Sequence, residues 1–193
     1  MRVADFVIDF LIKNNINLTY CVTGRGSLFL NDALAKNKKM KSIFMHHEQS
    51  AAFASVAYSQ ISNQPSCCMV STGCASTNTI TGVLSAWQDC IPLIFISGQH
   101  SLDETTNFTK SKIRTYGQQQ ADIISIIKPI TKYAVFINNP NIIQRELSKS
   151  LFLAQDKRKG PVWIDIPLDI QNMHVEEKKV YYVSKIKNTK LKK

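Results

Sequence analysis

Three short stretches of the sequence carry residue types that can do chemistry. In the first, Glu48 is a lone carboxylate that follows two histidines and precedes an alanine-rich run, within FMHHEQSAAFASVAY. A carboxylate or an imidazole at such a place can accept, donate or hold a proton during catalysis. His46 and His47 are neighbours on an extended segment, so at most one of them faces a site. The alternative is structural, because an acid in a helix first turn also complements the helix dipole.

The other two stretches are turns rich in glycine and small polar residues. Residues 24–27 (GRGS) can offer backbone N–H groups to an anion, but they lack the third glycine of a dinucleotide fingerprint and the lysine of a P-loop. A tight turn with Ser27 as the N-cap of the next helix is the stronger interpretation of this motif alone. Residues 73–78 (GCASTN) hold more capping residues than one helix needs, which indicates the close approach of either a ligand or a second backbone.

All three stretches lie where an expected strand gives way to an expected helix. Short apolar runs alternate with segments of helical period, and strands are expected at 18–22, 42–46, 66–72, 92–97, 132–137 and 161–167. Continuous Val, Ile, Phe and Cys strands between helices are typical of a parallel sheet covered on both faces. The pattern predicts a doubly wound α/β fold with a mainly parallel six-stranded sheet. In that fold ligands bind beyond the carboxyl ends of the strands, where the three stretches fall.

Length and charge are those of one globular domain with a basic end. The chain has 193 residues, 44% of them hydrophobic, and we expect a domain over residues 1–175 and a lysine-rich linker or tail over residues 176–193. The net charge is +10, but seven lysines lie in residues 178–193. The charge therefore indicates a solvated end and argues against nucleic-acid binding.

Cysteine usage and hydropathy indicate the cytoplasm. The five cysteines form no C-x-x-C pair and mostly sit in apolar runs, which suits a reducing compartment, and their spacing from the histidines predicts no metal site. No apolar run approaches the ~20 residues that span a bilayer, so no membrane partner is expected.

Four segments, in this order and spacing, resemble a known family. They are VTGRGSLFLNDAL, HHEQSAAFA, STGCASTNTITGVLSAWQDCIPLIFISGQ and KGPVWIDIPLDIQ. The combination is similar to the N-terminal, pyrimidine-binding domain of thiamine-diphosphate-dependent enzymes of the acetolactate synthase group, over roughly residues 1–173. A weaker likeness points to the acetolactate synthase-like proteins found with surface-polysaccharide biosynthesis.

The resemblance implies roles for particular residues. Glu48 matches the catalytic glutamate that hydrogen-bonds N1′ of the cofactor's aminopyrimidine and so helps remove the proton from thiazolium C2. Gln119 matches a glutamine near the reacting substrate, and His47 is the histidine assigned to the substrate side. The residues expected to bind the cofactor or shape its pocket are Gly24, Arg25, Gly26, Glu48, Gly73, Thr77 and Asn78.

The resemblance also implies partners. In the family the cofactor lies between this domain and a diphosphate domain that holds Mg²⁺ through a Gly-Asp-Gly motif, which does not occur in this sequence. We therefore expect a homo-oligomer or a complementary diphosphate-binding domain, and a 2-oxo acid substrate for decarboxylation or carboligation. The chain is then either a fragment of a longer enzyme or one subunit of a split enzyme. A non-catalytic interaction module of the same fold is the alternative from another class.

Departures from the family pattern bear on the substrate and on a flavin. Residues 73–75 (GCA) stand where the family has Gly-Pro-Gly, so a second glycine is missing. Gln118 replaces an aromatic residue before Gln119, so the resemblance leaves the substrate preference of acetolactate synthase an open expectation. Arg158 matches an arginine that touches FAD in acetolactate synthases, although the domain that holds most of the flavin is not in this sequence. FAD is therefore only an open expectation.

Two further expectations concern the surface. Residues 99–118 have no apolar period and follow a strand end, so they predict a surface loop at the catalytic edge. The small-residue faces around Glu48 and Cys74 permit close helix packing, and they predict pairing with a second copy or a homologous partner.

Overall fold

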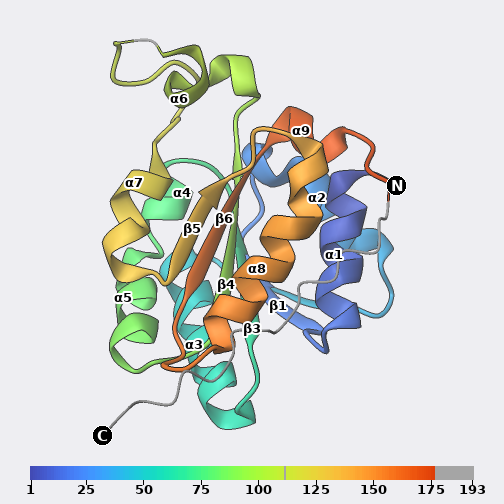
Figure 1. Cartoon of the computed structure of the whole chain (residues 1–193), viewed down its shortest axis with the longest axis vertical. Helices are drawn as coiled ribbons and strands as arrows, with labels where there is room; N and C mark the ends of the chain where they lie inside the picture. The colour runs from blue at the N-terminus through green and yellow to red at the C-terminus, as the bar shows by residue number, and fades with distance from the viewer. Residues whose placement is uncertain (111, 177–193) are drawn as a thin grey trace, which may run out of the picture.

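One parallel sheet organises the chain. The computed structural model describes residues 1–110 and 112–176, so most of the expected tail lies outside the described residues. Every neighbouring pair of strands is parallel, in the order β2-β1-β3-β4-β6-β5, which confirms the predicted α/β fold (Figure 1). The strands are β1 (Leu18–Cys21), β2 (Lys41–Phe44), β3 (Ser66–Val70), β4 (Leu93–Gln99), β5 (Tyr133–Phe136) and β6 (Val162–Pro167).

Helices connect these strands and cover both faces of the sheet (Figure 1). One layer, here called the first layer, consists of α1 (Val3–Lys13), α2 (Leu28–Lys36), α8 (Ile143–Gln155) and α9 (Leu168–Asn172). The opposite or second layer consists of α3 (Glu48–Ser62), α5 (Ile80–Gln88) and α7 (Ile123–Ile127). Short helical turns complete the chain: η1 (Arg25–Ser27), α4 (Cys74–Thr77), η2 (Leu102–Glu104), α6 (Thr106–Thr109), η3 (Lys128–Ile130) and η4 (Pro140–Ile142).

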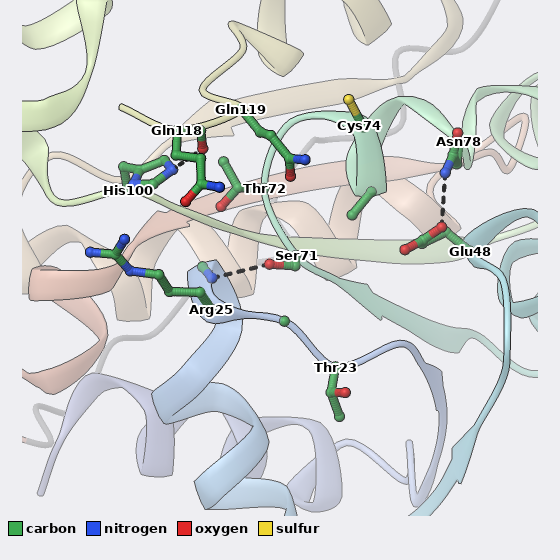
Figure 2. Close-up of a pocket in the computed structure, with 13 residues that line it drawn as sticks. Thr23, Arg25, Glu48, Ser71, Thr72, Cys74, Asn78, His100, Gln118 and Gln119 are labelled. Carbon is green, nitrogen blue, oxygen red and sulfur yellow. Dashed lines mark hydrogen bonds between the residues drawn. The ribbon is translucent and has the colours of Figure 1, made fainter. Parts of the chain in front are cut away.

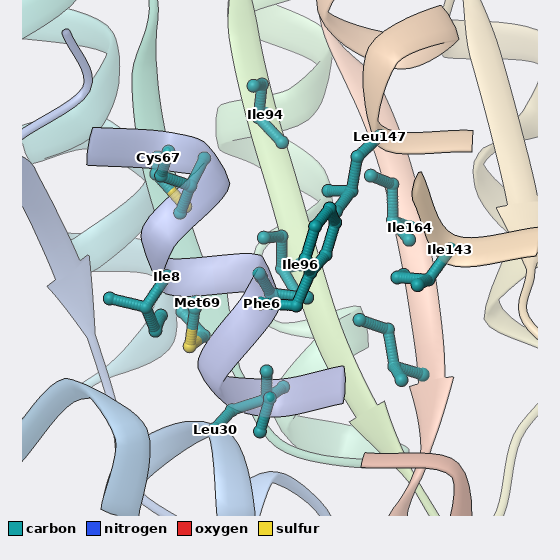
Figure 3. Packing of buried hydrophobic residues seen from close by; sticks show 14 of the residues in the cluster. Phe6, Ile8, Leu30, Cys67, Met69, Ile94, Ile96, Ile143, Leu147 and Ile164 are labelled. Carbon is teal, nitrogen blue, oxygen red and sulfur yellow. The ribbon is translucent and has the colours of Figure 1, made fainter. Parts of the chain in front are cut away.

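The first layer is an aliphatic core built on α1. Val3, Val7 and Leu11 recur at four-residue spacing on one face of this helix, and all three are fully buried. They share a buried cluster with alternate strand residues such as Met69 and Ile96, because successive side chains of a strand point to opposite faces. Figure 3 shows Phe6 and Ile8 of the same helix beside these strand residues. Outside this core, the helix carries acids and a lysine toward solvent.

The second layer relies on small residues. Ala51, Ala52 and Ser55 of α3 are fully buried, and the Ser55 hydroxyl donates to the carbonyl oxygen of Ala51 (2.9 Å). A Cβ atom placed on Gly82 of α5 would lie 2.5 Å from that of Ala52, so the two helices cross at the closest distance that a glycine allows. On the face of the sheet that this layer covers, the large side chains are Phe95 of β4 and Trp163 of β6. Their rings stack at 5.1 Å between centroids.

The chain reverses its direction along the sheet between β1 and β3. The helix after β1 enters the first layer, whereas the helices after β3 enter the second, so the loops that follow these two strands diverge. Ligands of open α/β sheets bind in the crevice that such a reversal creates. Within the described residues, no helix has the length and apolar character needed to cross a membrane.

Two local expectations have different outcomes. Asn139 does start a helical segment, because its side chain accepts a hydrogen bond from the backbone N–H of Asn141 (2.9 Å). Ser27 occupies the N-cap position of α2, but its hydroxyl donates back to the Gly24 carbonyl (3.3 Å) and makes no cap bond. In its described residues, the expected surface loop after β4 holds the short turns η2 and α6, and it projects from the body of the domain (Figure 1).

Candidate functional site

A cavity of about 390 Å³ opens at the reversal between β1 and β3 (Figure 2). Its walls come from the loops after β1 and β3, from the start of α3 and from the chain that follows β4, as expected for a parallel sheet. The lining residues are Thr23, Gly24, Arg25, Gly26, Glu48, Ser71, Thr72, Cys74, Ala75, Asn78, His100, Gln118 and Gln119.

Glu48 is the sole carboxylate among these lining residues. It is the first residue of α3 and is half-buried, and its Oε2 accepts a hydrogen bond from Nδ2 of Asn78 (2.9 Å). Asn78 follows the short helix α4, so a side chain from beyond β3 orients an acid from beyond β2 (Figure 2). The carboxylate is therefore fixed at the cavity wall while it stays open to a ligand.

The two histidines before Glu48 do not line the cavity. His47 is exposed and is the N-cap of α3, where its Nδ1 accepts from the backbone N–H of Gln49 (3.2 Å). His46 is exposed as well. The structure thus gives His47 a capping contact instead of a place beside Gln119, and its assigned substrate role has no geometric support here.

The glycines of residues 24–27 are explained by packing against the end of β3. A Cβ atom on Gly24 would overlap the side chain of Ser71, and one on Gly26 would overlap that of Thr72. The backbone N–H of Gly26 also donates to the Ser71 hydroxyl (3.1 Å). This loop is thus pressed onto its neighbour, and Arg25 extends from it as an exposed side chain.

Gly73 distinguishes between the two alternatives for residues 73–78, which are the close approach of a ligand and that of a second backbone. Its φ of +63° favours glycine, and a Cβ atom there would overlap the backbone carbonyl of Gln119. The close approach is therefore that of a second backbone, which places Gln119 at the cavity. Gly73 and Thr77 are not lining residues, and the Thr77 hydroxyl donates to the Cys74 carbonyl (3.1 Å).

Several lining residues were not assigned to the site from sequence. His100 is buried, and its ring nitrogens contact the backbone carbonyl of Gln118 and face the Glu104 carboxylate at 3.3 Å. His100 directly follows β4 and Thr72 lies two residues after β3, and these positions were the available indication. For Gln118 the available indication was its place beside Gln119, and the fold of the preceding loop brings both glutamines to the cavity.

A buried polar network lies behind this edge, on the second-layer face of β4 and β6. The Asp165 carboxylate accepts from the Ser97 hydroxyl (2.6 Å) and from Nε2 of Gln99 (3.2 Å), and Trp163 Nε1 donates to the same hydroxyl (2.8 Å). Complete burial raises the pKa of Asp165 to about 7, since the charged form loses hydration. Gln99 also donates to the carbonyl of Ala121 (2.9 Å), so the network ties the sheet to the segment that carries Gln119.

Comparison with known proteins gives the chain a family. The model of the family described as thiamine pyrophosphate enzyme, N-terminal TPP binding domain, matches residues 1–126. The chain belongs to this family. The resemblance found in the sequence is thereby confirmed.

Relatives of this thiamine pyrophosphate-binding domain are acetolactate synthases. The large subunit of acetolactate synthase isozyme 1 of Escherichia coli K12 is 33% identical over 168 residues, which are 87% of this chain and 28% of that protein. The acetolactate synthase large subunit of Corynebacterium glutamicum is 30% identical and is covered to 27%, with 91% of this chain matched. The chloroplastic acetolactate synthase of Arabidopsis thaliana is 29% identical and is covered to 24%, with 87% of this chain matched. The chain thus spans about a quarter of the length of these relatives.

Proposed function

We propose that this thiamine pyrophosphate-binding domain is the cofactor-activating part of an enzyme that decarboxylates or ligates 2-oxo acids. The observation that carries the proposal is the Glu48 carboxylate, which lines the cavity at the strand reversal and is oriented by Asn78. The family supplies the cofactor class, and the acetolactate synthase relatives supply the reaction class. The role in surface-polysaccharide biosynthesis stays a prediction of the sequence.

The donor set of the cavity fits the aminopyrimidine half of the cofactor. A flat heterocycle with ring nitrogens needs one group that shares a proton and walls that leave room for the ring. Glu48 supplies the group that shares a proton. Gly24, Gly26 and Ala75 line the cavity without bulky side chains, so the walls leave room for the ring. Asn78 already holds one carboxylate oxygen of Glu48, so little ordering is left to be done on binding.

The chain's own contribution to the reaction is positioning and proton holding. When bound, thiamine diphosphate supplies the electron sink for the carbon chemistry. Glu48 would hold or share the proton at N1′ of the pyrimidine, and Asn78 would keep that carboxylate in place. Gln118 and Gln119 reach the same cavity from another wall, where their amides would orient the polar groups of a 2-oxo acid.

The diphosphate and Mg²⁺ are assigned to a partner. A magnesium diphosphate needs hard oxygen ligands and phosphate-facing donors. The cavity offers Glu48 for the pyrimidine and a single basic side chain, Arg25. In the part of the chain that the structure describes, no group of three or more His, Cys, Asp or Glu is placed to hold a metal. We therefore propose a complementary diphosphate-binding domain, of a longer chain, a second copy or another subunit, as the other half of the site.

A bound flavin would contact this chain away from the cavity at Glu48. Arg158 precedes β6 and so lies at the amino ends of the strands, opposite Glu48. It lines a depression of about 500 Å³ together with Trp87, Lys132 and Lys159. Its Nε donates to Sγ of Cys90 (3.0 Å). This basic depression suits an anionic group, and FAD binding there stays a proposal of the resemblance.

The decisive experiment is Glu48→Gln in the complete enzyme or in the chain complemented with a diphosphate-binding domain. We expect exchange of the cofactor's C2 proton to fall about 10²–10⁴-fold, which is the range for losing a positioned acid or base. Unfolding free energy should change by no more than ~1 kcal/mol, because a first-turn acid contributes little more than that. Asp103→Asn, an exposed acid outside the cavity, is the matched control. Normal exchange in Glu48→Gln with cofactor bound would refute the proposal.

Cofactor titration of the chain alone tests the half-site. One or two hydrogen bonds, of ~0.5–1.5 kcal/mol each or ~1.5–3 kcal/mol where the Glu48 carboxylate takes part, fall short of most of the ~4–15 kcal/mol that association costs. Thiamine diphosphate with Mg²⁺ should therefore bind the 193-residue chain weakly or undetectably in calorimetry, and the complementary domain should restore binding and turnover. Micromolar affinity for the chain alone would show that it holds a complete site.

A further inference from the structure

Arg25 is a cation placed in the cavity, and no acid among the described residues forms an ion pair with it. It is the sole Lys or Arg among the lining residues and is exposed. In the described part of the chain, the ion pairs and side-chain hydrogen bonds involve other residues. Arg25 and Glu48 lie at opposite ends of the group of lining side chains in Figure 2. The cavity thus has an acidic end and a basic end.

The backbone that carries Arg25 is held on two sides. The neighbouring glycines are pressed against the end of β3, as described above. From the other side, Nε2 of Gln171 in α9 donates to the carbonyl of Gly26 (2.6 Å), and its Oε1 accepts from the backbone N–H of Leu30 (3.3 Å). Gln171 is itself fully buried. A guanidinium on so fixed a base is preorganised for a ligand, since the loop need not be ordered on binding.

The acid and the histidine of the cavity are already engaged. Glu48 is an acceptor and is held by Asn78. Both ring nitrogens of His100 have protein partners, the Gln118 carbonyl and the Glu104 carboxylate. An acidic group of a ligand in this cavity would therefore be paired by Arg25, whose planar fork matches carboxylate, phosphonate and sulfonate oxygens.

The chemistry of decarboxylation determines which acidic group of a substrate can pair with Arg25. When a 2-oxo acid loses CO₂, the bond between the carboxylate and the carbonyl carbon breaks, the electron pair stays on the side of the carbonyl carbon, and CO₂ departs uncharged. A cation paired with that carboxylate would stabilise the ground state more than the transition state and would slow the step. A cation paired with a second acid that is retained in the product would bind both states and impose no such cost.

We infer that Arg25 selects a 2-oxo acid that carries a second acidic group, remote from the reacting carbonyl, over one with an apolar tail. The inference rests on the proposed function and names its substrate class. Arg25 would act as a binding residue for the retained acid, at the end of the cavity away from Glu48. The expected preference is about tenfold or more in kcat/KM, the range for a charge-assisted hydrogen bond in place of a methyl group.

The first experiment needs no turnover. The ¹⁵Nε–H resonance of Arg25 is followed by NMR in the chain as it stands, during titration with glutarate and with glutaramide, which has an uncharged amide in place of each carboxylate. Glutarate should shift the resonance and the amide signals of Gln118 and Gln119, whereas glutaramide should not. Arg25→Met should abolish the glutarate shifts at the glutamines, and Arg114→Met, an exposed arginine outside the cavity, should preserve them. Equal shifts with both compounds, or none with glutarate, would overturn the inference.

The second experiment separates this inference from the proposed function. The enzyme complete with its diphosphate-binding domain is assayed with 2-oxoglutarate and with 2-oxopentanoate. Wild type should prefer 2-oxoglutarate, Arg25→Met should lose the preference mainly through KM, and Arg25→Lys should keep part of it. Equal use of both substrates, unchanged in Arg25→Met, would overturn the inference and leave the function standing. Turnover of neither substrate would count against the function, and the glutarate titration would then decide whether Arg25 binds acids.

Discussion

The two helical layers of this domain differ sharply in what they present to their surroundings. The helices α1, α2, α8 and α9 carry nine charged residues, whereas α3, α5 and α7 carry one, Glu48. Exposed large apolar side chains show the opposite distribution. In the helices of the first layer Leu28 is such a residue, whereas the second layer exposes Phe53, Tyr58, Ile61, Leu84, Trp87 and Ile126.

Polar contacts follow the same division. In the first layer Arg2 pairs with Asp5 (2.8 Å) and Asp32 (2.7 Å), and Arg145 pairs with Glu146 (2.7 Å). No ion pair between two residues of the second-layer helices occurs in the described ranges. The surface of the first layer is thus charged and suited to contact with water, whereas the surface of the second layer has the apolar character of a protein–protein interface. Because Glu48 begins α3, that contact would adjoin the cavity, which supports the predicted pairing.

The faces of the sheet beneath the layers differ too. Under the first layer, β4 and β6 present aliphatic side chains such as Ile96 and Ile164. Under the second layer the same strands present the Ser97, Trp163 and Asp165 network. The difference shows that the aliphatic core lies under the first layer, whereas the face under the second layer combines apolar packing with a buried polar network.

The largest effect should come from the first layer. Leu11→Ala removes a fully buried side chain of α1 and should lower the free energy of unfolding by ~2–5 kcal/mol, measured by urea denaturation. Ile61→Ala, at a side chain of α3 that is 88% exposed, should change it by no more than ~0.5 kcal/mol. Comparable losses in the two variants would mean that the second layer stabilises this chain as the first does.

The buried acid of the second layer should make stability depend on pH. Burial raises the pKa of Asp165 from its ordinary 3.8 to about 7, so the folded chain holds a proton that the unfolded chain releases between these values. Stability should therefore fall as pH rises from about 4 to about 7, by at most ~1.4 kcal/mol per pH unit, and level off above. Asp165→Asn should remove this component when urea midpoints of both proteins are compared across pH. Parallel pH profiles would show that Asp165 is ionised in the folded chain throughout.

Association is the smallest expected effect and the sharpest test of the contrast. Phe53→Glu combined with Leu84→Glu places two acids on the exposed faces of α3 and α5, and should weaken self-association or binding of a diphosphate-binding domain by about tenfold or more. Met173→Glu, at a side chain 41% exposed beyond α9, is the control and should leave association unchanged. Sedimentation equilibrium measures both. A wild type that stays monomeric at high concentration and binds no such domain would remove the proposed interface.

Local patterning was enough to predict the sheet but not all of the site. The six strands were visible because each is a continuous apolar run bounded by polar turns, and their parallel order follows from the helices between them. Residues 73–78 predict the close approach of a ligand or a second backbone, and the structure shows the backbone of Gln119 at Gly73. Pattern alone left the two alternatives open, since the partner lies far along the chain.

The contacts that sequence reasoning did not predict join distant parts of the chain. Asn78 is among the residues expected at the pocket, but its hydrogen bond to Glu48 joins residues thirty apart that follow two different strands. His47 was assigned to the substrate, whereas the backbone at the start of α3 takes its Nδ1 as a cap. A histidine beside an acid has the same local pattern in both roles. Only the direction in which the helix leaves the strand separates them.

The contact between Gly73 and Gln119 divides the segment after β4 into two parts. The part next to the cavity, called here the foot, holds Gly117 and Gln119, and the projecting part, called the tip, holds Phe108, Ile113 and Tyr116. At the foot, Gly117 packs on the His100 ring, and Gln119 abuts a backbone that tolerates no side chain at position 73. At the tip, Phe108, Ile113 and Tyr116 stand more than half exposed. The tip can therefore change in sequence while Gln119 keeps its place at the cavity. A combinatorial library confined to residues 112–116 would sample new entrances to the cavity with few members lost to misfolding.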